Sequence, residues 1–108
     1  MKVTINHPIK SMNYVSDRKT VLDKVRKCGA WLCYASEELQ DDKEVVLAAV
    51  QNNAVALKYA SKRLQDDEEI VQEALRKNVY MLNYASKRIQ KDKKISEDIM
   101  KYIFDYYS

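Results

Sequence analysis

The two cysteines and the single histidine are the residues of this sequence best suited to nucleophilic or metal chemistry. Cys28 and Cys33 are five positions apart, which matches neither a redox Cys-x-x-Cys pair nor a zinc half-site. A catalytic thiolate needs a nearby base, and His7 precedes Pro8 in the least regular part of the chain. We therefore expect two free thiols and no Cys-His active site.

The acidic runs are the second group that could do chemistry. Asp41-Asp42 and residues 66–69 contain neighbouring carboxylates, but they lack the spacing and the glycine pivot of a calcium-binding loop. Acidic residues are also favoured at the start of helices. The sequence contains no nucleotide-binding fingerprint and no Ser-His-Asp order. We expect no metal, no cofactor and no enzymatic activity.

Tyrosines recur at intervals of 25 residues. Tyr34, Tyr59 and Tyr84 lie one position away from the main apolar pattern, so their rings are expected along one side of the molecule. Tyrosine is favoured at recognition surfaces and as a base-stacking platform. Because every copy retains it whatever the surrounding charge, packing between repeats is the interpretation that we favour.

Charged pairs occupy positions that vary between the copies, and such positions are where a binding function is expected. They could form a patch for a phosphate or an acidic partner, although charges on a solvated helix usually serve solubility. The candidate partner-binding residues are therefore Glu37, Glu38, Lys62, Arg63, Lys87 and Arg88, together with the tyrosine column.

An internal repeat positions all of these residues. Residues 31–42, 56–67 and 81–92 align without gaps at an offset of 25, and the segments that follow them align as well. In the first half of a copy, Leu57, Ala60 and Leu64 have helical spacing. We expect one helix of about 10 residues for each first half.

The second half of each copy also has a helical pattern. An aspartate begins it and can accept hydrogen bonds from free backbone N–H groups; these residues are Asp17, Asp42, Asp67 and Asp92. The second helix should end near Cys28, Asn53 and Asn78, where glycine or asparagine favours a left-handed cap.

The repeat predicts an all-α protein in the form of a short α-solenoid, with one domain over residues 1–108. The units are approximately 5–29, 30–54, 55–79 and 80–108, and each two-helix unit buries its apolar side only by stacking on its neighbours. The first unit is degenerate, with Pro8 opening its first helix. The last helix runs on through its aromatic residues, which are expected to cap the stack, although they could equally form an exposed docking strip.

The residue pattern resembles the tandem repeats called domain of unknown function 4116. The likeness covers roughly residues 17–100 and rests on the Leu-x-Tyr-Ala-Ser core in register with the aspartate-initiated helix. Ala54 and Val79 stand where the family usually has the glycine retained as Gly29, so we expect tighter or more helical linkers there. The resemblance implies the fold and no particular activity.

Composition and charge narrow the functional classes. The 108 residues carry a net charge of +3, positive over residues 1–30 and negative over 31–55, so the basic surface is interrupted. No apolar run is long enough to cross a membrane and no signal peptide is recognisable, which favours a cytoplasmic protein.

Three functional hypotheses follow. The first is a non-catalytic module that binds another protein through its helical-repeat surface, with an uncertain oligomeric state. The second is a nucleic-acid-binding protein that uses the Lys/Arg columns and the tyrosines. The third is a small viral or mobile-element inhibitor of a host or defence complex.

Overall fold

The computed structural model describes residues 14–107, and every regular element within this range is helical. The prediction of an all-α protein is therefore confirmed for this part of the chain. The predicted first helix at Pro8 lies outside it. The elements in order are α2 (Arg18–Lys27), η1 (Gly29–Tyr34), α3 (Glu37–Gln40), α4 (Lys43–Asn52), η2 (Ala54–Tyr59), η3 (Leu64–Asp66), α5 (Glu68–Lys77), η4 (Val79–Tyr84), α6 (Lys87–Gln90) and α7 (Lys93–Tyr107).

The long helices begin where the recurring aspartates predict. The N–H of Val45 donates to Asp42 Oδ1 at 3.2 Å, and the N–H of Ile70 donates to Asp67 Oδ1 at 3.1 Å. Asp92 caps α7 in the same way. Asp17 differs, because its carboxylate accepts a hydrogen bond from the Thr20 hydroxyl instead.

The first half of each unit is not the single α-helix that we predicted. It is a six-residue 3₁₀-helix, then two extended residues, then about one helical turn. The break occurs because the backbone N–H of the serine bonds to the preceding unit: Ser61 donates to the Gln40 carbonyl and Ser86 to the Gln65 carbonyl, both at 2.9 Å. A continuous helix would use these N–H groups internally.

The predicted left-handed caps are also wrong. Cys28, Asn53 and Asn78 all have extended backbones, and no described residue has a positive φ. The asparagine side chains instead accept hydrogen bonds from residues that follow them in the chain. Asn53 Oδ1 accepts from the Val55 N–H, and Asn78 Oδ1 accepts from the Tyr80 N–H. They start the next 3₁₀-helix rather than end the α-helix.

Glycine is required at position 29 because the backbone there passes close to α4, and not because of its backbone angles. A Cβ at this position would lie 2.2 Å from the Ala49 carbonyl oxygen. The predicted tightening at Ala54 and Val79 is absent, because η1, η2 and η4 all have six residues.

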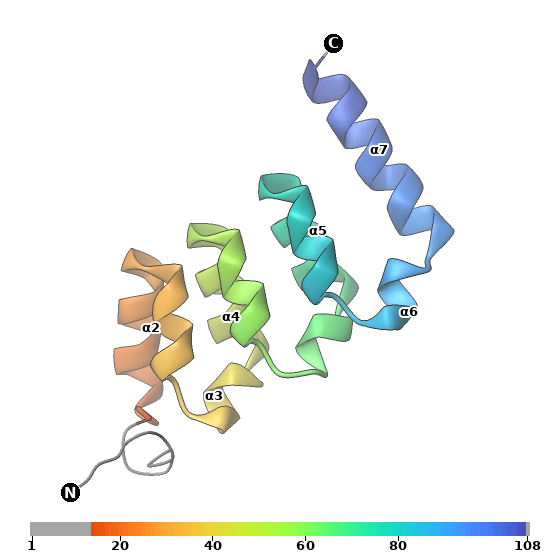
Figure 1. Cartoon of the computed structure of the whole chain (residues 1–108). Helices are drawn as coiled ribbons and strands as arrows, with labels where there is room; N and C mark the ends of the chain where they lie inside the picture. Colours follow the sequence, from red (N-terminus) through yellow and green to blue (C-terminus); the bar gives the residue numbers. More distant parts are fainter. Residues whose placement is uncertain (1–13, 108) are drawn as a thin grey trace, which may run out of the picture.

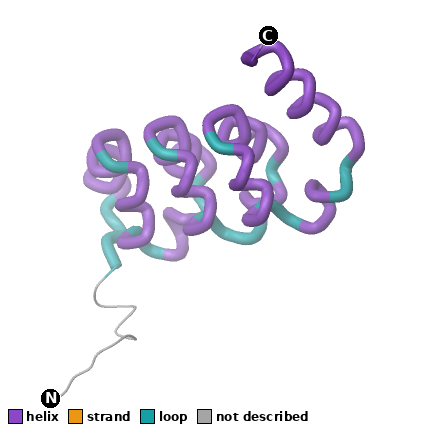
Figure 2. The backbone as a smooth tube through the Cα atoms, turned by 45° about the horizontal axis from the view of Figure 1, so that its top comes forward, coloured by secondary structure: helices purple, strands orange, loops and turns teal. Residues whose placement is uncertain are grey.

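The units lie side by side in chain order. Figure 1 shows α2, α4 and α5 as neighbouring helices of one row, and Figure 2 shows the loops recurring at matching places. The core runs along this row, and Val45, Val46, Ala49 and Val50 of α4 are all buried. No described polar or charged residue is buried. The superhelical winding of the stack stays a prediction.

The last helix is long, as predicted, but most of its aromatic residues do not cap the core. Ile95 is buried and Ile99 packs against the core, whereas Phe104 and Tyr106 are each 72% exposed. Figure 1 shows α7 extending beyond the end of α5 towards the C-terminus. Within the described range no helix combines the length and the hydropathy that crossing a bilayer requires.

Candidate interaction surface

Two of the predicted surface arginines connect consecutive units. Arg63 Nε donates to Asp41 Oδ1 at 2.8 Å and its Nη2 to the Asp41 carbonyl at 2.6 Å. The Ser61 hydroxyl donates to the same carboxylate at 2.6 Å. Arg88 and Ser86 hold Asp66 in the same way, 25 residues later. We call each of these sets a Ser-Arg clasp.

The first junction has no such clasp. Glu38 stands where the clasps have arginine, and Ser16 stands where they have aspartate. A pair of backbone hydrogen bonds remains, because the Val15 N–H donates to the Tyr34 carbonyl and the Ser36 N–H to the Val15 carbonyl, each at 2.8 Å. Arginine therefore occupies this position of the repeat where the preceding unit has a facing aspartate, and glutamate occupies it where the preceding unit has Ser16.

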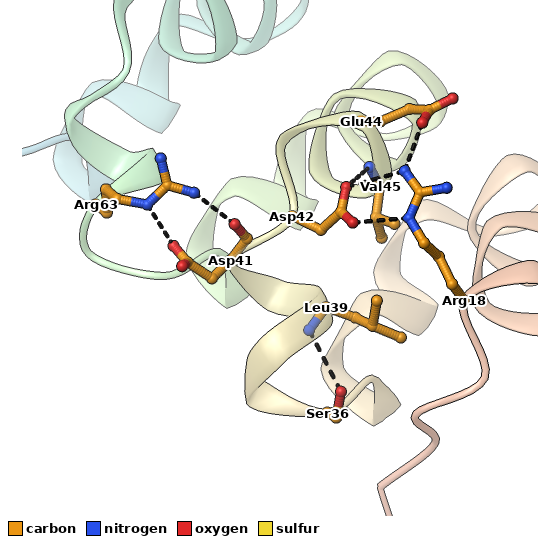
Figure 3. A network of polar contacts seen from close by, with 8 residues as sticks. All are labelled: Arg18, Ser36, Leu39, Asp41, Asp42, Glu44, Val45 and Arg63. Carbon is orange, nitrogen blue, oxygen red and sulfur yellow. Dashed lines mark hydrogen bonds and ion pairs between the residues drawn. The ribbon is translucent and has the colours of Figure 1, made fainter.

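A second set of ion pairs joins the starts of neighbouring long helices. Arg18 donates to Asp42 and Glu44, as Figure 3 shows beside the Arg63–Asp41 clasp. Lys43 Nζ lies 3.1 Å from Asp67 Oδ2 and 2.9 Å from Glu69 Oε1. At the third junction, between α5 and α7, the corresponding residue is negatively charged, because Glu68 occupies the repeat position of Arg18 and Lys43.

The clasps shift the acid–base behaviour of their carboxylates. Hydrogen bonds from Ser61 and Arg63 hold the pKa of Asp41 below its ordinary value, and those from Ser86 and Arg88 do the same for the pKa of Asp66. The hydrogen bond from Arg18 lowers the pKa of Asp42. These aspartates therefore remain charged well into the acidic range.

The other charged candidates lie outside the clasps. Glu37 and Glu38 open α3, Lys62 precedes Arg63 in a turn, and Lys87 opens α6. All four are exposed. Lys62 and Lys87 form no ion pair within residues 14–107.

The tyrosine column lies on the 3₁₀-helices. Tyr34 is 55% exposed and meets Trp31 edge-on with ring centroids 5.6 Å apart. Tyr59 is half-buried and has the Lys58 ammonium 5.2 Å from its ring centroid. Tyr84 is 40% exposed. The column combines packing with exposed ring surface, and its role in binding stays a prediction.

Four large apolar side chains of the last helix are exposed, and the candidate binding residues taken from the sequence did not include them: Met100, Tyr102, Phe104 and Tyr106. Met100 is 65% exposed, whereas Val50 and Leu75, at the same place in the repeat, are 0% and 2% exposed. Phe104 falls at the place of Gly29, Ala54 and Val79. A large aromatic residue where the other units have smaller ones was the signal that could have identified this surface.

Two grooves separate α7 from α5. One, of about 300 Å³, has Leu75, Ile99 and Tyr102 in its walls together with charged residues of both helices. The other, of about 450 Å³, is lined by Val79, Tyr102 and Tyr106 among others. The packing of the row therefore loosens at its last junction.

The cysteines form no disulfide, and Cys28 is exposed. Burial is the main cause that raises the pKa of the Cys33 thiol, with a smaller contribution from Cys28. A raised pKa disfavours the reactive thiolate. No cluster of three or more potential metal ligands occurs among the described residues.

A family model described as a domain of unknown function (DUF4116) matches residues 17–65, 44–90 and 67–108. The chain belongs to the DUF4116 family. The three overlapping matches agree with tandem repeats of that family. Comparisons with curated proteins and with solved structures give no match.

Proposed function

We propose that this DUF4116 chain is a non-catalytic module that binds another protein through its C-terminal apolar surface. We define this surface as Met100 and Phe104, which are four positions apart on one side of α7. Tyr102 and Tyr106 lie on the other side, where they line the grooves with Val79. The observation that carries the proposal is the exposure of these side chains on a helix whose first turns pack into the core. Contiguous exposed apolar surface with a polar rim is typical of protein-binding sites.

The composition of this surface also favours a protein partner. Aromatic residues and methionine are enriched in the centres of protein interfaces. Charged residues surround the groove beside it, among them Arg76, Asp98, Lys101 and Asp105. A surface with an apolar centre and charges of both signs at its edge fits a protein better than the phosphate backbone of a nucleic acid.

The nucleic-acid hypothesis has less support than the sequence suggested. It relied on Arg63 and Arg88 as cations, and both are engaged by Asp41 and Asp66. Lys62 and Lys87 remain, but Glu37 and Glu38 lie in the corresponding places of the preceding unit. This edge of the row therefore lacks a continuous basic stripe.

Site-specific photo-crosslinking tests the proposal. A photoreactive amino acid placed at Phe104 should give discrete, protease-sensitive adducts in cells that naturally express the protein. The same amino acid at Lys24, which is exposed on α2 at the other end of the row, is the matched control and should give none. Nuclease-sensitive adducts, adducts from the control position alone or no adduct at all would contradict the proposal.

A further inference from the structure

One strip of each long helix faces the following unit throughout the row. In α2 it includes Arg18, which pairs with α4, and Val25, which is buried. In α4 it includes Lys43, which pairs with the start of α5, and the buried Val50, and Ala54 at the start of η2 is also buried. The strip is thus covered by the next unit wherever a next unit exists.

The third long helix follows the same rule. Gln72 and Leu75 of α5 line one groove against α7, and Val79 lines the other. These residues are 25 positions beyond Leu47, Val50 and Ala54. The repeat therefore specifies which residues of α7 face the place where a further unit would lie.

The corresponding residues of α7 are Lys93, Glu97 and Met100. Phe104 follows them on the same side because α7 continues where the other long helices end, and we call these four residues the outer strip of α7. Their spacings of four, three and four positions put them on one side of the helix, and all four are exposed. Lys93 has the place of Arg18 and Lys43 but forms no ion pair within residues 14–107. The outer strip therefore resembles half of a junction that none of the described residues completes.

Charge indicates what completes this junction. In the first two junctions, the cation binds the aspartate that caps the next long helix and the glutamate two residues after it, as with Asp42 and Glu44. Lys91 replaces Asp41 and Asp66 at this end, so a further cation lies beside Lys93. A segment with carboxylates in its first turn fits this end of the molecule.

A second copy of the chain fits less well. The long helix at the other end of the row is α2, and it has Lys19 where the internal junctions have Glu44 and Glu69. A head-to-tail contact would bring this lysine towards Lys93. Like charges facing each other oppose association.

We infer that the outer strip of α7 binds a helix of another protein that begins with carboxylates in Asp-x-Glu spacing and continues with an apolar side. This inference rests on the proposed function and specifies its partner. Lys93 would contact the two carboxylates, while Met100 and Phe104 would contact the apolar residues that follow.

Binding of a defined peptide to the full chain tests the inference. The probe is a fluorescent peptide with the sequence of residues 66–79, held helical by a hydrocarbon staple because a helix of this length is marginal alone. In the chain this helix provides Asp67 and Glu69 to Lys43. A peptide with lysine at both acidic positions is the control, and fluorescence anisotropy measures both.

The acidic peptide should bind and the lysine peptide should not. Phe104→Asp should weaken binding about 30-fold, as expected for a central aromatic contact, and Lys93→Glu about fivefold. Lys24→Glu and Lys27→Glu are control substitutions at exposed positions of α2, at the other end of the row, and should leave the affinity unchanged. Circular dichroism checks that each variant remains folded.

Other results would overturn the inference. These are equal binding of both peptides, no binding of the acidic one, or binding that Phe104→Asp leaves intact. A dimer in sedimentation that Phe104→Asp dissociates would assign the strip to a second copy. Protein adducts from position 104 without peptide binding would retain the proposed function and reject the acidic helix.

Discussion

At the scale of single residues, Gly29 illustrates how the repeat sets local requirements. It donates its N–H to Asn52 Oδ1 at 2.7 Å and has no room for a side chain against α4. Ala54 and Val79 occupy the same place in later units, and Val79 is 38% exposed. The requirement for glycine is therefore a property of the first junction and not of the repeat.

Gly29→Ala should destabilise the protein by about 1–3 kcal/mol, because the new methyl group must displace backbone atoms of α4. Urea denaturation followed by circular dichroism measures the free energy of unfolding. Val79→Ala is the matched control, since a Cβ is already present there, and it should cost less. Equal effects of the two substitutions would refute the steric explanation.

At the scale of elements, the junctions depend on aspartates in two roles. Asp42 and Asp67 cap long helices and accept ion pairs, while Asp41 and Asp66 are the centres of the Ser-Arg clasps. For the pKa of Asp67, burial acts to raise the value, but hydrogen bonds from Ile70 and Lys43 outweigh it. All four carboxyl groups have a lowered pKa in the folded protein.

The protein should therefore lose stability in acid. A carboxyl group whose folded pKa is depressed contributes stability above its unfolded pKa of about 3.9, and this is lost as pH falls through the folded value. We expect the urea midpoint to fall steeply from about pH 4 downwards. Asp41→Asn with Asp66→Asn should lower the midpoint at neutral pH and flatten this dependence. A double variant with the full acid dependence would show that other groups cause it.

The sequence was sufficient for some features of these elements and not for others. The apolar columns were predicted correctly because Leu57, Ala60 and Leu64 are buried as their spacing requires. The break at Ser61 was missed because the same spacing also fits a continuous helix. Its cause is a hydrogen bond between units, which a helical pattern within one unit does not reveal. The clasp was missed for the same reason, since Asp41 and Arg63 meet only after the units have stacked.

At the scale of the whole molecule, the described part is an elongated row with extents of 55 × 26 × 20 Å. A central unit packs on two neighbours and a terminal unit on one. Leu57 is fully buried, whereas Leu82, at the same place in the last unit, is only partly buried. In a repeat protein, stability is approximately a sum over units and the contacts between neighbours.

Leu57→Ala should therefore cost about 2–5 kcal/mol, and Leu82→Ala clearly less, although the two changes remove the same atoms. Thermal and urea denaturation of both variants measure the difference. A Leu82→Ala variant that is as unstable as Leu57→Ala would indicate that the last unit is as tightly packed as the central one.

The Ser-Arg clasp also affects how the protein can be lengthened by duplication of one repeat. After an in-frame duplication of the codons for residues 42–66, the arginine of the inserted copy would face the original Asp66, and the aspartate of the inserted copy would face Arg88. Lys43 and its duplicate would likewise each find an aspartate and a glutamate in the following copy. Because each inserted copy carries one half of two different contacts, lengthening the protein leaves no contact of these kinds without its counterpart.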